Sequence, residues 1–248
     1  MSNTMQLHRL PLAGYPIVST TANALSSLLQ GRLAATKKTV LLFANTNFAL
    51  KCQAMRPWFN SDEVVIVNDG IGLDIAALLI HGRQYIENLN GTDFNPFFLE
   101  RLNASRKVFL LGGKPGVAKK AGAVIDRKFG RQIVGCLDGY TKMPATALCE
   151  TINQSGAEIV FVAMGNPIQE EWIYKYKDSL NAILFIGVGA FFDFYSGNVQ
   201  RAPQWIQQIH CEWLFRLFKE PRRLMRRYTV DVIGFMILCV RFRLSGKK

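Results

Sequence analysis

Several side chains that could act on a substrate stand directly after short apolar runs of the sequence. The clearest case is Asp69, which follows the apolar run 64–67 and lies between Asn68 and Gly70. A carboxylate in such a place can accept the proton of an attacking hydroxyl as a general base. It can also cap the helix expected to follow, since aspartate is a preferred N-cap residue. The spacing alone leaves both roles open.

Glycines end two further apolar runs. Gly112 and Gly113 precede Lys114 after one run, and Gly187 and Gly189 follow the other. Glycine lets backbone N–H groups approach a phosphate closely, and the N-terminus of a following helix adds a favourable dipole. The same glycines could serve only a tight turn between strand and helix. The sequence GGKPG is neither a Walker A loop nor a GxGxxG fingerprint, so it does not identify a nucleotide.

Two other aspartates are candidates for ligand contacts. Asp93 comes after Gly91-Thr92, a position more typical of a helix cap than of a ligand. Asp193 stands in a Phe-Phe-Asp-Phe sequence, where an ionised carboxylate is costly unless it is paired. A ribose hydroxyl or a basic residue such as Arg201 could be that partner.

Gln169 and Glu170 form a polar pair that follows a Gly-Asn-Pro turn, at the start of another expected helix. Their side chains could hydrogen-bond a sugar. They could also do no more than satisfy the free N–H groups in the first turn of that helix.

The sequence gives no indication of a metal centre. Its three histidines share no motif and its five cysteines lack Cys-x-x-Cys spacing, so neither a zinc site nor a disulfide framework is expected. It also lacks an Asp-x-Asp pair, the usual sequence hint of a divalent ion that holds a sugar nucleotide. We therefore expect no cofactor, and thiols that stay reduced in a cytoplasmic protein.

The elements that must position these residues form an alternating pattern. Short apolar runs bounded by turn residues alternate with helical segments, which is typical of a parallel sheet covered on both faces. This predicts an α/β, Rossmann-like fold whose ligands bind outside the carboxyl ends of the strands. The expected strands are 39–44, 64–67, 108–111, 132–136, 159–162 and 183–186, and the expected helices are 22–34, 48–56, 73–80, 117–129, 145–154 and 169–177, with a β-like segment at 10–12.

Charge is concentrated at the end of the chain. The 248 residues carry a formal net charge of +12, and from Arg201 onward eleven basic residues face three acidic ones. If the segment from Pro221 is helical, its arginines share one face, and apolar residues follow at 232–240. That run is too short for a bilayer span of roughly 20 residues. It favours an anchor lying on an anionic membrane surface, with an ordinary solvated helix as the alternative.

Taken together, the motifs resemble the WecG/TagA/CpsF family of glycosyltransferases over residues 10–228, nearly the whole chain. Their number and order make the resemblance specific. The motifs that carry it are NDG at 68–70, LLGGKPG at 110–116, DGY at 138–140, MGNPIQE at 164–170, GVGAFFD at 187–193, RAP at 201–203 and EWLFR at 212–216.

The resemblance implies an inverting, metal-independent transfer of a sugar from a UDP-sugar donor to a polyprenyl-diphosphate-linked sugar acceptor. It implies a GT-E type, modified Rossmann-like core over 1–200 and a helical, membrane-associating appendage over 201–248. The enzyme would lie peripherally on the cytoplasmic face of the inner membrane and serve the assembly of cell-surface polysaccharide. A second copy of the chain remains open as a partner, and nucleic acid is not expected.

Carried over residue by residue, the resemblance makes Asp69 the catalytic base and places Asn47 in the sugar pocket. It implies that Tyr140, Gln169 and Asp193 hold the UDP, while Arg216, Arg223 and Arg226 close over the site and meet the diphosphates. The full set expected to contact substrates is Asn45, Asn47, Thr92, Asp93, Gly112, Gly113, Lys114, Tyr140, Gln169, Glu170, Gly187, Gly189, Asp193, Arg201, Arg216, Arg223 and Arg226.

One motif departs from the family pattern. Where many members read Thr-x-Asn-x-Glu, this chain has Asn-Thr-Asn-Phe-Ala at 45–49. Because these positions adjoin the expected sugar pocket, UDP-glucose is favoured as donor, in exopolysaccharide assembly. The alternative is UDP-N-acetylmannosamine or its uronic acid, as in teichoic acid or enterobacterial common antigen assembly.

Three other classes of protein were weighed. A nucleotide-binding oxidoreductase should carry a dinucleotide loop followed by an acidic residue, which GGKPG does not supply. A nucleic-acid-binding module should show a recognisable binding motif besides its basic segment. The third class is a nucleotide-binding scaffold at the membrane surface that has no catalytic activity. A catalytic role of Asp69 would distinguish the enzyme from this scaffold.

Overall fold

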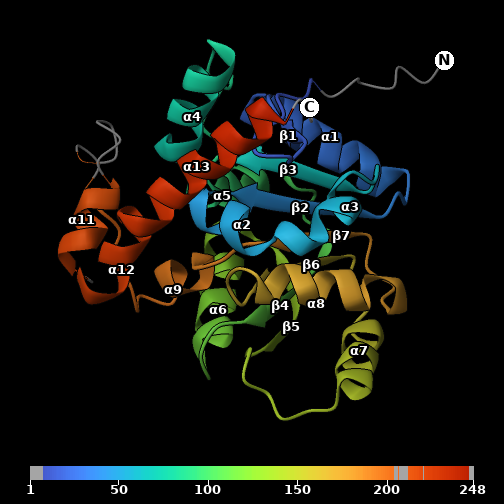
Figure 1. Cartoon of the computed structure of the whole chain (residues 1–248). Coiled ribbons are helices and arrows are strands. Elements are labelled where there is room, and N and C mark those ends of the chain that lie inside the picture. The colour runs from blue at the N-terminus through green and yellow to red at the C-terminus, as the bar shows by residue number, and fades with distance from the viewer. Residues whose placement is uncertain (1–7, 204–205, 207–211, 220, 246–248) are drawn as a thin grey trace.

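The fold is a seven-stranded sheet with helices on both faces (Figure 1). Every neighbouring pair of strands is parallel, in the order β1-β3-β2-β7-β6-β4-β5. The predicted α/β, Rossmann-like class is therefore confirmed. The strands are β1 (Ile17–Val18), β2 (Thr39–Ala44), β3 (Val64–Asn68), β4 (Lys107–Gly112), β5 (Gln132–Leu137), β6 (Ile159–Ala163) and β7 (Leu184–Gly187). The computed structural model describes residues 8–203, 206, 212–219 and 221–245.

The central strands are apolar except for Thr39 and Asn68 at strand ends, because both of their faces are buried. All residues of β2, β3, β6 and β7 are buried. Alternate residues of one strand enter opposite cores: Val40 packs on one side of β2, and Leu41 on the other.

Helices from both halves of the chain cover the two faces. The helices that contribute buried residues to one core are α1 (Ala22–Ala34), α5 (Gly91–Arg101), α6 (Val117–Phe129) and α9 (Phe191–Tyr195). Those of the other core are α2 (Thr46–Lys51), α3 (Arg56–Phe59), α4 (Ile71–His81), α7 (Ala145–Gln154), α8 (Ile168–Tyr176) and α13 (Val230–Leu244). Short 3-10 turns lie at Gln53–Met55 and Lys177–Ser179.

Local signals explain where the best-predicted helices begin and end. The hydroxyl of Thr21 accepts a hydrogen bond of 3.3 Å from the N–H of Ala24 and so caps the start of α1. Helix α6 ends at Gly130, which takes the left-handed conformation at φ +60° and donates to the carbonyl of Asp126.

The last helices combine a peripheral pair with one that returns to the core. Helices α11 (Glu212–Lys219) and α12 (Pro221–Tyr228) lie beside the sheet domain, and α12 begins at its proline as expected (Figure 1). Helix α13 contacts α2 and α4 and buries Phe235 and Cys239. The guanidinium of Arg56 lies 4.8 Å from the ring centre of Tyr15 and 4.4 Å from that of Phe242, which joins α13 to the N-terminal segment.

Three expectations about local structure are wrong. The single helix expected over 48–56 is broken into α2 and α3, because Pro57 near the start of α3 has no N–H with which to continue the preceding turn. The β-like segment 10–12 is not a strand of the sheet; it pairs through an isolated bridge between Leu12 and Tyr15 and a hydrogen bond of 2.8 Å from the N–H of Leu10 to the carbonyl of Ile17. Helix α5 is capped by Asn90, whose side-chain oxygen accepts from the N–H of Asp93 at 2.9 Å, and not by Asp93 itself.

Candidate active site

A cavity of about 580 Å³ opens at the carboxyl edge of the sheet, where β2, β3, β6 and β7 end. This is the crevice between the two halves of the strand order, the usual ligand position in open α/β sheets. The predicted substrate residues that line it are Asn45, Asn47, Asp69, Thr92, Gln169, Gly187, Gly189 and Arg226. It is also lined by Phe43, Lys51, Gly91, Gly165, Asn166, Val188, Ala190, Phe191, Phe194 and Asp231.

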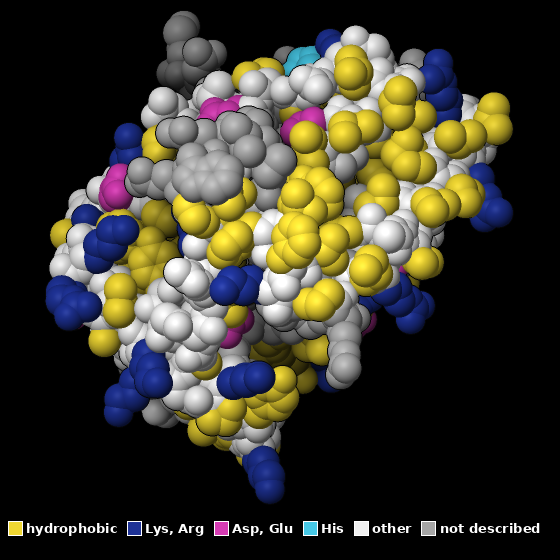
Figure 2. All heavy atoms as spheres, turned by 90° about the vertical axis from the view of Figure 1, so that its left-hand side faces the viewer, with side chains coloured by type: hydrophobic (Ala, Val, Ile, Leu, Met, Phe, Trp, Pro, Cys, Tyr) yellow, Lys and Arg dark blue, Asp and Glu magenta, His cyan; other side chains and the backbone are white. Residues whose placement is uncertain are grey.

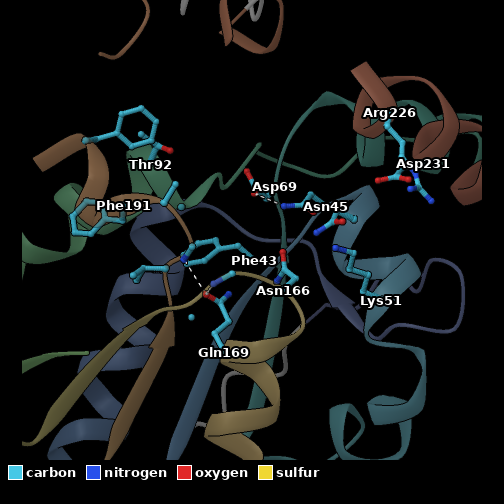
Figure 3. A pocket seen from close by; sticks show the side chains of 18 residues that line it. Phe43, Asn45, Lys51, Asp69, Thr92, Asn166, Gln169, Phe191, Arg226 and Asp231 are labelled. Carbon is cyan, nitrogen blue, oxygen red and sulfur yellow. Dashed lines mark hydrogen bonds between the residues drawn. The ribbon is translucent and has the colours of Figure 1, made fainter. Parts of the chain in front are cut away.

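Asp69 projects into this cavity and is oriented by Asn45 (Figure 3). The side-chain oxygen of Asn45 caps α2 by accepting from the N–H of Phe48 at 3.1 Å, which turns its amide nitrogen toward Asp69 Oδ2, also at 3.1 Å. The backbone N–H of Asp69 donates to the carbonyl of Ala44 at 2.7 Å and so continues the β2–β3 pairing. The N-cap position of α4 is taken by Gly70 and not by Asp69.

Gln169 ties together the loops that follow β6 and β7. Its side-chain oxygen accepts from the N–H of Gly165 at 3.2 Å and from that of Gly189 at 3.1 Å. Its amide nitrogen donates to Glu170 Oε1 at 2.8 Å. A side chain at Gly187 would place its Cβ 3.0 Å from this amide nitrogen. Gln169 therefore lines the cavity and also holds together the two loops that form its base.

Glu170, the neighbour of Gln169, is fully buried. Its Oε1 accepts from the amide of Asn166 at 2.7 Å as well as from Gln169, and its Oε2 lies 3.7 Å from Cys52 Sγ. Burial raises the pKa of the Glu170 carboxyl, while the hydrogen bonds from Gln169 and Asn166 act in the opposite direction. Burial first, and then the charge of Glu170, raise the pKa of the Cys52 thiol.

The two sides of the cavity differ in character (Figure 3). Lys51 at the end of α2, Arg226 of α12 and Asp231 of α13 lie on one side, while Thr92 and Phe191 lie on the other. Lysine and arginine can bind phosphate, so the charged side is suited to an anionic group. Helices α11 and α12 contain the two other predicted arginines, Arg216 and Arg223, whose side chains lie outside the described part of the structure.

The glycine loop after β4 has a structural explanation. Gly112 has φ +128°, and a Cβ there would lie 2.3 Å from the carbonyl oxygen of Ala163 on the neighbouring strand. The N–H of Gly113 donates to that oxygen at 2.7 Å, and the carbonyl of Gly113 accepts from Gly139. Gly112, Gly113, Lys114 and Tyr140 are not among the lining residues within the described chain, and the Tyr140 side chain is exposed.

Arg201 connects the sheet domain with α11. Its guanidinium pairs with Asp93 of α5 and lies 3.7 Å from Glu212 Oε2. Asp93 also accepts from the amide of Asn90 at 2.8 Å. Asp193 lies in the first turn of α9, beside the cavity residues of that helix.

Some lining residues were missed by sequence reasoning. Lys51 follows Asn47 by four positions, and i, i+4 spacing on the expected helix would have put both on one face. Asp231 and Arg226 come together only because α13 returns to the sheet domain, which sequence spacing does not reveal. Among the residues that the structure describes, no group of three or more His, Cys, Asp or Glu could hold a metal ion.

The length of the helices and a comparison with known families complete the description. Each helix in the described part of the chain is too short or too polar to cross a bilayer. The family model described as "Glycosyl transferase WecG/TagA/CpsF family" matches residues 10–248. With Asp69 in a cavity at the sheet edge and the match covering nearly the whole chain, the protein belongs to the WecG/TagA/CpsF family of glycosyltransferases.

Proposed function

We propose that this glycosyltransferase moves a sugar from a UDP-sugar to a polyprenyl-diphosphate-linked sugar, with Asp69 as catalytic base and without a metal ion. The observation that carries the proposal is the Asp69 carboxylate, which lines the cavity while Asn45 fixes one of its oxygens at 3.1 Å. A carboxylate that is oriented by a hydrogen bond within a substrate cavity is suited to accept a hydroxyl proton.

The reaction would be a single displacement. The acceptor hydroxyl attacks the anomeric carbon while Asp69 takes its proton, and the bond from that carbon to the UDP oxygen breaks, with the electron pair leaving on UDP. Attack from the side opposite the leaving group inverts the anomeric configuration. The base must therefore act on the acceptor face of the sugar, with the diphosphate on the other face.

Stabilisation of the departing UDP would come from fixed positive charge. Lys51 and Arg226 line the cavity, and Arg216 and Arg223 are proposed to join them from α11 and α12. Preorganised cations and backbone dipoles that face developing charge supply much of the rate enhancement in such reactions. Guanidinium groups suit diphosphate oxygens because their donors bind in pairs.

The test is transfer of radiolabelled sugar from a panel of UDP-sugars to a synthetic lipid-diphosphate-sugar. Asp69→Asn should lower the transfer rate by about 10²- to 10⁴-fold, while UDP binding measured by calorimetry persists. Asp126→Asn is the matched control, since it removes an exposed carboxylate of α6 remote from the cavity. Normal turnover by Asp69→Asn would exclude Asp69 as the base.

The same panel of UDP-sugars identifies the sugar donor. We propose UDP-glucose, in exopolysaccharide assembly, because the loop 45–49 departs from the family pattern. Preferential transfer from UDP-N-acetylmannosamine or its uronic acid would replace that choice and leave the mechanism unchanged. UDP binding without transfer from any donor would favour the membrane-surface scaffold.

A further inference from the structure

Helix α4 presents an apolar stripe to solvent, although its other face is part of the core. Ile71, Ile75, Leu78 and Leu79 are 44% to 60% exposed. Their spacing places them on one side of the helix. The opposite side, which includes Leu73, is buried against the sheet domain. Contiguous exposed aliphatic side chains are unfavourable in water and commonly mark an interaction site, so this stripe is suited to bind another apolar surface.

Helix α13 carries a second apolar stripe of the same kind. Its core side buries Phe235 and Cys239. Its solvent side is made by residues that recur at helical spacing and are 46% to 81% exposed. These residues are Val230, Ile233, Ile237, Val240 and Leu244.

The two stripes belong to neighbouring helices. Helices α4 and α13 contact each other, and the Arg243 guanidinium donates to the carbonyl of Leu79 at 3.2 Å. Figure 2 views the molecule from the side of α11, α12 and α13, and shows apolar side chains gathered there with Lys and Arg around them. We call the nine exposed residues of the two stripes the α4/α13 surface.

The position of this surface relates it to the candidate active site. Helix α4 begins two residues after Asp69, and Asp231 in the first turn of α13 lines the same cavity. Both stripes therefore start at the rim of the cavity. Whatever covers the surface would bring its own groups to that rim.

We propose that the α4/α13 surface is a membrane-docking face, which rests on an anionic bilayer with α4 of the sheet domain as a second contact beside α13. Charge supports lipid as the occupant. Exposed Arg83, Arg241 and Arg243 flank the ends of the two helices, and basic side chains beside an apolar stripe suit anionic headgroups. Two copies of the chain would instead bring like charges together.

The proposal extends the sequence-based prediction of a membrane-associating appendage, which lay wholly within residues 201–248. The biological role of this docking rests on the proposed function: an acceptor carried on a polyprenyl chain would reach the cavity from the lipid side. Binding itself is tested without substrate.

The test is co-sedimentation of the full chain with phosphatidylglycerol-containing vesicles, compared with vesicles of phosphatidylcholine alone. Leu79→Glu on α4 and Ile233→Glu on α13 should each weaken binding to the anionic vesicles by about tenfold or more, since each loses aliphatic contact and gains a repelled charge. Ala123→Glu is the matched control, because it adds the same charge to an exposed position of α6 on the other side of the sheet. Thermal melting confirms that each variant is folded.

The outcomes separate the alternatives. Loss of binding in both variants and not in the control supports the proposal. Loss in Ile233→Glu alone overturns it, since α13 would then be the whole anchor. Unchanged lipid binding, with a shift from dimer to monomer in light scattering of Leu79→Glu, also overturns it and makes a second copy the occupant. Leu79→Glu should still glycosylate a short-chain, water-soluble acceptor, whereas Asp69→Asn should bind vesicles and transfer sugar at least about 10²-fold more slowly.

Discussion

Replacing Glu170 tests whether the buried carboxylate holds the floor of the cavity together. Its Oε1 accepts from two amides, Gln169 at 2.8 Å and Asn166 at 2.7 Å. Glu170→Ala leaves both donors without this acceptor, the buried Gln169 amide with no route to water and the half-buried Asn166 amide facing the cavity. An unsatisfied buried donor costs about 1–3 kcal/mol and an ordinary hydrogen bond contributes about 1 kcal/mol, so losing both should lower the free energy of unfolding by about 2–4 kcal/mol.

Glu170→Gln provides the matched comparison. Glutamine keeps the shape of the side chain and retains one oxygen that can accept from both amides. Its loss of stability should therefore be about 1.5 kcal/mol or less, the difference between a charged and a neutral acceptor. Both variants are compared by urea unfolding followed by circular dichroism. Equal losses in the two variants, or no loss in Glu170→Ala, would refute the reasoning.

The substitution should also weaken binding of the UDP-sugar. Gln169 links Gly165 and Gly189 at the ends of β6 and β7, and releasing it would loosen both loops around the cavity. Glu170→Ala is expected to raise the KM for the UDP-sugar more than it lowers kcat, because Asp69 keeps its own support from Asn45.

The raised pKa of Glu170 also predicts a pH dependence of stability. The folded chain holds this proton in a pH range where the unfolded chain, with a glutamate pKa of about 4.3, has released it. The contribution of Glu170 to the free energy of unfolding therefore falls as pH rises from about 4.3 through the folded pKa. The difference between wild type and Glu170→Gln, measured across this range, should show that decline.

Two further predictions concern neighbouring positions. Asn45→Ser retains a helix-capping oxygen and loses the amide that orients Asp69, so kcat should fall by about tenfold or more with stability changed by less than about 1 kcal/mol; a large loss of stability with normal kcat would contradict the assigned roles. Gly112→Ala meets both an unfavourable φ of +128° and the Ala163 carbonyl at 2.3 Å, and should lower the free energy of unfolding by about 3 kcal/mol or more. Gly31→Ala, with open space around its Cβ in helix α1, should instead stabilise by about 0.5–1 kcal/mol in the same melting assay.

Much of the fold could be predicted because its signals are local. The bounds expected for helices 22–34, 117–129 and 145–154 agree with α1, α6 and α7. Strand β2 also agrees, since a strand buried on both faces is almost entirely apolar. Errors arose where the chain turns within a few residues, as at Pro57. There the fixed φ and missing N–H of a single proline interrupt the helix that the apolar pattern predicts.

The site was predictable in part. Placing Asp69 and Gly187 at strand ends followed from the parallel arrangement, and both line the cavity. The loop at Gly112 carries an equally suggestive pattern, yet its glycines are needed for the approach of Ala163. A glycine that makes room for a ligand and one that makes room for a neighbouring strand look the same in a sequence.

The sequence by itself determined the alternation of strands and helices, the edge at which polar residues collect and the family, because periodicity and ordered motifs are properties of the chain. Only the tertiary structure decided that Asn45 orients Asp69, that Gln169 bridges Gly165 and Gly189, and that α13 brings Asp231 to the cavity. These contacts depend on distances and directions between elements far apart in the chain. Packing sets those distances, and no local pattern records them.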